Sequence, residues 1–223
     1  MYQTILFDLD GTLTDSGQGI LNSVAYALEQ IGIVEPDVAN LQHFIGPPLY
    51  ESFPRFYQLN QEETQTAIDD FRIYFKEKGM FENQLYPGII PLLEELKAAG
   101  KTLVIATSKP EIFAKQILEH FGIAHYFAII AGASLDNSRI SKSDVIYYAL
   151  KQTDYKPQTT IMVGDRKHDI EGAVANQLDS IGVLYGYGNR QELEEAGATT
   201  IVETITDLQK ILLNKDQKKP ASS

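Results

Sequence analysis

Apolar residues along the chain fall into two alternating kinds of run. Six short runs are typical of buried strands: Thr4–Leu9, Thr102–Ala106, Phe127–Ala131, Thr160–Val163, Ser180–Leu184 and Thr200–Val202. Between most of them, apolar positions follow a helical spacing: Ile89–Ala99, Glu111–Phe121, Lys142–Thr153, Asp169–Asn176, Arg190–Ala196 and Ile205–Leu213. This alternation predicts an α/β fold with a doubly wound, mostly parallel, Rossmann-like sheet.

One connection interrupts the alternation. The 68 residues from Gly17 to Gln84 hold no convincing strand, although ordinary connections between a strand and a helix are far shorter. Apolar side chains recur there at helical spacing: Ile20, Val24, Ala27, Leu28 and Ile31, and again Ala67, Ile68, Phe71, Tyr74 and Phe75. We therefore expect residues 17–84 to form an inserted helical cap domain, and residues 1–16 and 85–214 to form the α/β core. The polar residues 215–223 are expected to form a disordered tail.

Composition narrows the class of protein. With 223 residues, of which 43% are hydrophobic, the chain can build one main domain that carries a smaller one. No segment approaches the roughly 20 apolar residues of a membrane span, and the first residues lack the basic region of a signal peptide. There are no cysteines, which excludes disulfides, thiolate metal sites and cysteine nucleophiles. We expect a cytoplasmic location and no membrane partner.

The net charge of the chain bears on two classes of binding partner, nucleic acids and anionic substrates. The formal net charge of −11 gives no electrostatic footprint for nucleic acid. An anionic substrate would also be repelled by the protein as a whole, so it could bind only where cations are gathered locally.

Polar residues gather at the carboxyl ends of the predicted strands, which is where an open parallel sheet binds ligands. The first strand runs into Asp8-Leu9-Asp10-Gly11-Thr12, the second into Thr107-Ser108-Lys109, and the fourth into Gly164-Asp165, with Asp169 four residues later. Lys142 begins the helix that follows the third strand. Four carboxylates and a lysine are therefore expected to converge at one edge of the sheet.

The cost of gathering four carboxylates is removed by a hard cation such as Mg²⁺, which takes oxygen ligands and bridges to phosphate. Gly11 permits a tight loop whose backbone N–H groups, at Gly11 and Thr12, can point at an oxyanion. Each motif alone has a simpler interpretation. Asp10-Gly11 is commonly just a turn, and Asp169 could merely cap the following helix.

Taken together, these four motifs resemble, in order and spacing, those of the haloacid dehalogenase-like hydrolases. The resemblance covers roughly Tyr2 to Leu213. It implies that Asp8 is the nucleophile that forms an aspartyl-phosphate, and that Asp10 is the general acid/base, with its backbone carbonyl on the metal. It further implies phosphate contacts from Thr107 and Ser108, charge neutralisation by Lys142, and a Mg²⁺ site completed by Asp165 and Asp169.

Two details refine the resemblance. The dehalogenase branch lacks an acid at the position of Asp10 and needs no metal, so Asp10 favours a phosphatase. The lysine of the third motif stands here in Ser141-Lys142-Ser143, which departs from its frequent Lys-Pro setting. Lys142 is therefore assigned by its position in the alternation, and Lys109 remains an alternative for the same charge.

The motifs look most like those of 5′-nucleotidases, close to phosphoglycolate phosphatases. The leading hypothesis is a phosphomonoesterase acting on a small phosphorylated metabolite, as a monomer or homodimer. A phosphoglycolate phosphatase, a sugar-phosphate mutase and a metabolite-binding regulator without turnover remain alternatives. Tyr185-Gly186-Tyr187-Gly188 is too short for a dinucleotide fingerprint.

Candidate substrate residues lie in the predicted cap, which is rich in aromatic residues. Helical spacing makes most of these rings candidates for the cap's own core. An aromatic residue such as Tyr50, Phe53 or Phe56 could instead stack on a nucleobase. If phosphoglycolate is the substrate, Arg55 is the better candidate, because it could bind the carboxylate.

Overall fold

The computed structural model describes residues 1–136 and 138–213. The chain divides into two compact units: Met1–Leu13 with the described residues from Leu85 onward, and Thr14–Gln84. We call the first the α/β unit and the second the helical unit. The tail predicted for residues 215–223 lies outside the described residues.

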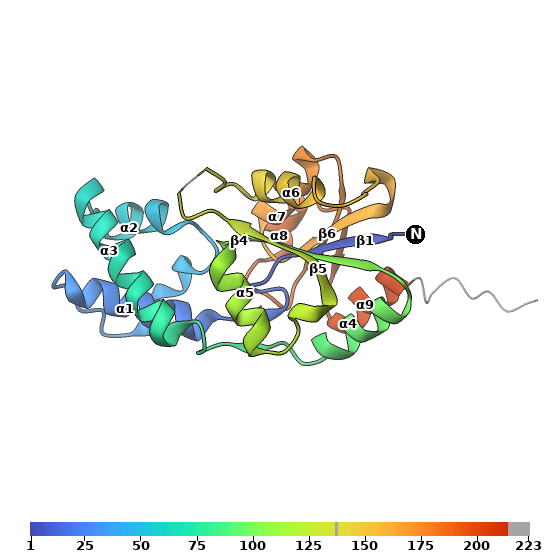
Figure 1. The fold of residues 1–223 in the computed structure, drawn as a ribbon. Helices are drawn as coiled ribbons and strands as arrows, with labels where there is room; N and C mark the ends of the chain where they lie inside the picture. The colour runs from blue at the N-terminus through green and yellow to red at the C-terminus, as the bar shows by residue number, and fades with distance from the viewer. Residues whose placement is uncertain (137, 214–223) are drawn as a thin grey trace, which may run out of the picture. The chain divides into compact units, whose positions relative to one another are not determined.

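A six-stranded parallel sheet forms the centre of the α/β unit (Figure 1). The strand order is β5-β4-β1-β6-β7-β8. The strands are β1 (Thr4–Phe7), β4 (Thr102–Pro110), β5 (Phe127–Ala133), β6 (Thr160–Gly164), β7 (Asp179–Val183) and β8 (Thr200–Val202). The predicted doubly wound α/β fold is therefore confirmed, and all six predicted strands are present.

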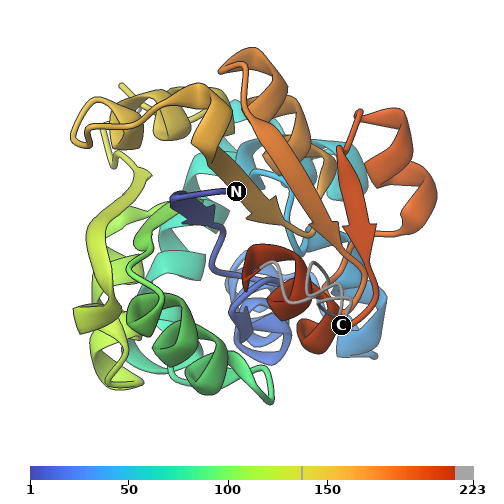
Figure 2. The same cartoon turned by 90° about the vertical axis from the view of Figure 1, so that its right-hand side faces the viewer.

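Helices cover both faces of this sheet, which explains why its strands are almost continuously apolar. On one face lie α6 (Lys142–Leu150), α7 (Lys167–Ala175) and α8 (Arg190–Glu195), and on the other α4 (Ile89–Ala98), α5 (Glu111–His120) and α9 (Ile205–Leu213) (Figure 1). Leu6, Val104 and Met162 share one buried cluster with Val145 and Ile146 of α6. Figure 2, seen from the edge where β1 begins, shows α4 (green) beside α9 (dark red), with which it packs.

The helical unit contains α1 (Gly17–Gln30), α2 (Leu49–Tyr57) and α3 (Gln61–Tyr74), with a 3₁₀ segment at Val38–Phe44 and a π-helical turn at Phe75–Gly79. Helix α3 begins with a capping box: the Asn60 side chain accepts from the amide of Glu63, whose carboxylate accepts from the amide of Asn60. Helices α1 and α3 pack on one another closely. At Gly19 and Gly79 only hydrogen fits, because a Cβ on Gly19 would overlap the Gly79 carbonyl.

Two short strands were missed from the sequence. β2 (Thr14–Asp15) and β3 (Gln84–Leu85) pair with one another where the chain passes between the two units. Two residues are too few to show an alternation, so periodicity could not have revealed them. Among the described helices, none combines the length and apolar character that a membrane span requires.

Candidate active site

The register of the sheet brings the predicted motifs to one level. Phe7 at the end of β1 pairs with Ile105 of β4 and Val163 of β6. Beyond this level the three strands run into Asp8, Thr107 and Asp165, all toward the carboxyl edge of the sheet. The amide of Asp8 still donates to the carbonyl of Val163 at 2.9 Å. Strand β1 ends at Phe7, two residues earlier than predicted, because the chain turns at Leu9, whose carbonyl accepts from the amide of Leu13.

Three carboxylates meet at this edge. Asp8, Asp165 and Asp169 are all buried, and each offers an oxygen within 4.8 Å of those of the other two. Burial raises the pKa of Asp165, and the nearby charges of Asp169 and Asp8 raise it further. Burial likewise raises the pKa of Asp169, and Lys142 offsets only part of that rise. Such a group is costly unless a cation lies among its members.

Lys142 supplies one such cation. Its ammonium lies 2.8 Å from Asp8 Oδ1 and 2.7 Å from Asp169 Oδ1, and it donates to the Ala106 carbonyl at 3.1 Å. Burial by itself lowers the pKa of Lys142, but Asp169 and Asp8 outweigh that effect, so its pKa is raised and it stays charged. One ammonium cannot balance three ionised carboxylates, so a further cation would favour their ionised forms.

Helix α6 presents Lys142 from its first turn. The hydroxyl of Ser141 accepts from the amide of Asp144 at 3.1 Å and so caps the helix. Lys109, the alternative for the same role, lies elsewhere: its ammonium is 2.9 Å from Asp10 Oδ2. The structure therefore places Lys142 beside Asp8 and Lys109 beside Asp10.

Asp10 stands apart from the three-carboxylate group. Its Oδ2 is paired with Lys109, while its Oδ1 is buried without a hydrogen-bond partner. The next residue, Gly11, has a φ of +80°, and a Cβ there would overlap the Asp165 carboxylate. Only glycine therefore lets the chain turn so close to Asp165.

The predicted phosphate-binding residues Thr12, Thr107 and Ser108 differ in burial and in hydrogen-bond partners. Thr12 is buried, its hydroxyl donates to Asp165 Oδ1 at 3.3 Å, and its amide donates to the Leu9 carbonyl at 3.3 Å. Both Thr12 donors are thus used inside the protein, which argues against its predicted phosphate contact. Thr107 is buried and accepts from the amide of Lys109, whereas Ser108 is exposed at the same edge.

Asp169 combines the two roles considered from the sequence. Its Oδ2 accepts from the amide of Arg166 at 3.0 Å and so closes the first turn of α7. Its Oδ1 faces Lys142. Capping fixes the orientation of the carboxylate, because one oxygen is held by the backbone while the other points into the cluster.

The structure also shows partners of this cluster that sequence reasoning missed. The amide of Tyr187 donates to Asp165 Oδ2 at 2.8 Å, and the Tyr185 hydroxyl donates to the Thr12 carbonyl at 3.1 Å. The closely spaced glycines of this segment, Gly186 and Gly188, were the available signal, because such glycines mark a close approach of backbone to other groups.

The substrate residues predicted in the helical unit divide by exposure. Phe53 has an exposed fraction of 0% and its ring lies 5.0 Å from that of Phe44, so it belongs to the hydrophobic core and offers no face to a base. Tyr50 is 50% exposed, and Arg55 is exposed with its guanidinium 5.2 Å from the Phe56 ring. Tyr50 and Arg55 thus remain candidates, and Phe53 is not one.

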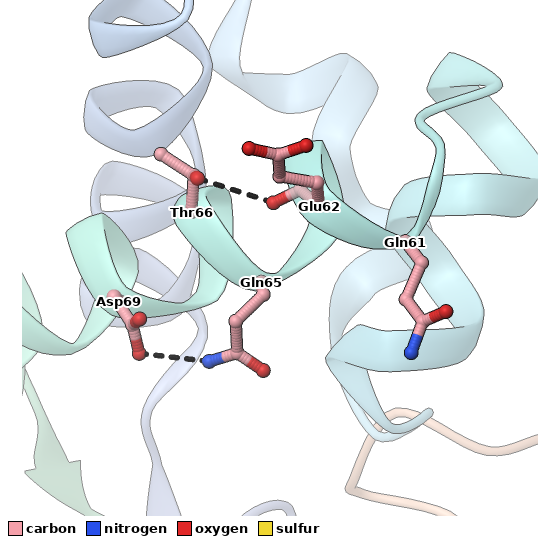
Figure 3. A pocket seen from close by; sticks show the side chains of 5 residues that line it. All are labelled: Gln61, Glu62, Gln65, Thr66 and Asp69. Atoms are coloured by element: carbon pink, nitrogen blue, oxygen red, sulfur yellow. Dashed lines mark hydrogen bonds between the residues drawn. The ribbon is translucent and has the colours of Figure 1, made fainter.

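A pocket on the surface of α3 is lined by none of the residues that the sequence predicts for the active site or for substrate binding (Figure 3). It is lined by Gln61, Glu62, Gln65, Thr66 and Asp69. Thr66 donates to the Glu62 carbonyl, and Gln65 donates to Asp69 at 3.0 Å. These exposed side chains bond along their own helix, as on an ordinary solvated surface.

The donor set fits a hard divalent cation. All its atoms are carboxylate oxygens, the three side chains are buried, and a single lysine leaves their charge unbalanced. Mg²⁺ takes oxygen ligands and prefers few carboxylates together with water and phosphate. Asp8, Asp165 and Asp169 could therefore hold it. The carboxylate of Asp10 lies outside this group and is engaged by Lys109.

Comparisons with known proteins agree on one family. A sequence model described as "Haloacid dehalogenase-like hydrolase" matches residues 5–183. The chain is 42% identical over 211 residues to a 5′-nucleotidase of Pseudomonas aeruginosa, covering 95% of this chain and 96% of that protein. It is 43% identical over 204 residues to the tyrosine-protein kinase PtkA of Mycobacterium tuberculosis, covering 92% of this chain and 69% of that protein. A phosphoglycolate phosphatase of Colwellia psychrerythraea is 29% identical over 214 residues, 92% of this chain and 95% of that protein.

Comparison with solved structures supports the same family. The crystal structure of a predicted phosphatase from Clostridium acetobutylicum superimposes with a TM-score of 0.91 at 50% identity, covering 96% of this chain and 99% of that one. The chain therefore belongs to the haloacid dehalogenase-like hydrolases, and to the phosphatases of that family.

Proposed function

We propose that this protein is a Mg²⁺-dependent phosphomonoesterase that works through an aspartyl-phosphate on Asp8. The observation that carries the proposal is the position of Asp8, buried at the carboxyl edge of the sheet between Lys142 and two further carboxylates. Mg²⁺, when bound, would supply positive charge for the phosphoryl oxygens. The protein's own residues account for the remaining steps.

The first half of the reaction transfers the phosphoryl group. A carboxylate oxygen of Asp8 attacks phosphorus, and the bond from phosphorus to the ester oxygen breaks. Asp10, in its protonated form, gives its proton to the departing oxygen, so the alcohol leaves neutral. Lys142 holds Asp8 in place and offsets charge on the phosphoryl oxygens.

The second half regenerates the enzyme. Asp10, now a carboxylate, takes a proton from water as that water attacks phosphorus. The bond from phosphorus to the Asp8 oxygen then breaks, which releases inorganic phosphate and restores both carboxyl groups. The same residue serves as acid and then base, so a single well-placed carboxyl is sufficient.

For the substrate, we propose nucleoside 5′-monophosphates. The phosphate site is blind to the leaving group, so selectivity must come from another segment, and the helical unit is the one that we assign as a cap. The 42% identity over nearly all of a 5′-nucleotidase supports this choice. Phosphoglycolate is the alternative substrate, with Arg55 in place of an aromatic ring as the selecting residue.

A screen of phosphorylated metabolites with Mg²⁺ tests the proposal. We expect phosphate release, with nucleoside monophosphates exceeding phosphoglycolate in kcat/KM. The reverse order would favour the phosphoglycolate alternative. Because the similar PtkA is named a tyrosine kinase, the screen includes ATP, and tyrosine phosphorylation without release of phosphate from monoesters would contradict a phosphatase. The cytoplasmic location and the monomeric or dimeric state stay predictions.

A further inference from the structure

The segment Tyr185-Gly186-Tyr187-Gly188 follows β7 and lies against Asp165. We propose that this segment, which we call the YGYG loop, is a positioning element that fixes the Asp165 carboxylate for the divalent cation. The inference rests on the proposed function, because it assigns the loop to that metal site. The loop contacts Asp165 and the turn at Gly11 and Thr12.

The loop holds one oxygen of Asp165 directly. The amide of Tyr187 donates to Asp165 Oδ2 at 2.8 Å, while the Thr12 hydroxyl donates to Oδ1 at 3.3 Å. Two donors on two different oxygens fix the rotation of the carboxylate as well as its position. Partners of this kind orient metal-binding side chains and tune their affinity.

The loop can come this close only because it is made of glycine at two positions. A Cβ on Gly186 would overlap the Gly11 carbonyl and lie 2.5 Å from Asp165 Cβ. A Cβ on Gly188 would overlap the carbonyl oxygen of Asp165 itself. Any side chain at either position must therefore displace Asp165 or the loop.

Tyr185 ties the loop to the turn that follows Asp8. Its hydroxyl donates to the Thr12 carbonyl at 3.1 Å, and its ring meets Tyr86 edge to face at 5.1 Å. Burial raises the pKa of the Tyr185 phenol, and Asp165 raises it further, so the phenol remains a donor at neutral pH. Tyr185 thereby acts on Asp165 Oδ1 indirectly, through Thr12, whereas the amide of Tyr187 holds Oδ2 directly.

The test measures Mg²⁺ binding separately from turnover. Metal-free protein is titrated with MgCl₂, and the midpoint of thermal unfolding gives the Mg²⁺ affinity. We expect Gly186→Ala to weaken Mg²⁺ binding about 10–100-fold, and Tyr185→Phe about tenfold, as for other partners of metal ligands. Turnover of both variants should return as MgCl₂ is raised, which a collapsed active site would not show.

Two matched variants serve as controls. Gly122→Ala places a side chain at a φ of +69° with no atom near its Cβ, so it strains the backbone without reaching Asp165. Tyr2→Phe removes a hydroxyl that donates to Asp179 at 2.8 Å, at the start of β7. Both should lower the unfolding midpoint and leave the Mg²⁺ affinity unchanged.

The outcomes separate the two proposals. If the wild type binds Mg²⁺ and Tyr185→Phe and Gly186→Ala bind it equally well, the positioning role is wrong and the phosphatase proposal stands. If the wild type binds no Mg²⁺, the metal-dependent function itself fails. Should Gly186→Ala not fold, Tyr185→Phe decides the question alone.

Discussion

At the scale of single residues, Asp8 is the residue on which the proposed chemistry depends. Asparagine has nearly the same shape but is a poor nucleophile, so Asp8→Asn should leave the fold intact and reduce turnover at least about 10⁴-fold. Steady-state assays with p-nitrophenyl phosphate, together with circular dichroism, measure both effects. Asp69→Asn, on the exposed surface of α3, is the control that should keep full activity. Turnover of Asp8→Asn at the wild-type rate would refute the assignment.

Asp10 should show a different signature, because it moves a proton. Asp10→Asn should reduce turnover about 10²–10⁴-fold. The loss should be larger for an alkyl phosphate than for p-nitrophenyl phosphate, since nitrophenolate leaves without needing a proton. Comparison of kcat for the two substrates checks this. Equal losses with both would mean that Asp10 does not protonate the leaving oxygen.

Phe53 and Tyr50, three residues apart in helix α2 but opposite in exposure, should separate stability from substrate binding. Phe53 is fully buried against Phe44, so Phe53→Ala should cost about 3–5 kcal/mol of unfolding free energy. Tyr50→Ala should barely change stability but reduce kcat/KM for nucleoside monophosphates about 5–150-fold. Denaturant unfolding and kinetics with a nucleotide and p-nitrophenyl phosphate measure these effects. An equal loss with both substrates would argue against stacking on the base.

At the scale of elements, the first turn of α6 matters because it carries Lys142. Ser141→Ala removes the cap and should cost about 1 kcal/mol of stability. Loss of the cap should fray the first turn of α6, which carries Lys142 beside Asp8, so turnover should also fall. Asn60→Ala removes the equivalent cap from α3 and is the matched control: a similar loss of stability with turnover unchanged. Equal turnover in the two variants would show that the cap of α6 does not position Lys142.

The elements also show what could be read from the sequence. The strands of the large sheet were predictable because both of their faces are buried, which leaves continuous apolar runs such as Ile5–Phe7. The convergence of Asp8, Asp165 and Lys142 followed from strand ends that share one edge. The pairing of β2 with β3 did not, because two-residue strands have no period.

Other parts of the site were beyond sequence reasoning for a different reason. The contact of the Tyr187 amide with Asp165 is made by the backbone, so the flanking glycines Gly186 and Gly188 signal a close approach but not its partner. Thr12 was predicted to offer its amide to phosphate, yet that amide donates to the Leu9 carbonyl at 3.3 Å, because the sequence does not show which turn the chain makes after Asp8. Phe53 was grouped with Tyr50 because helical spacing alone did not decide which ring faces inward.

At the scale of the whole molecule, charge makes the metal important for stability as well as turnover. The net charge is −11, and buried carboxylates add local repulsion. Chelation should abolish turnover, and MgCl₂ at about 100 times its dissociation constant should stabilise the fold by about 2.7 kcal/mol. Ca²⁺ should inhibit, because its looser coordination would misplace Asp8. Thermal unfolding and assays with and without chelator measure this, and undiminished turnover in excess chelator would exclude the metal requirement.

The central claim is that phosphorus is bonded transiently to Asp8. The most direct test is to quench the protein during turnover, reduce the acyl phosphate with borohydride and locate the modified residue by mass spectrometry. The proposed mechanism predicts modification of Asp8 in the wild type and none in Asp8→Asn. A label on a different residue, or rapid turnover with no labelled residue, would contradict it.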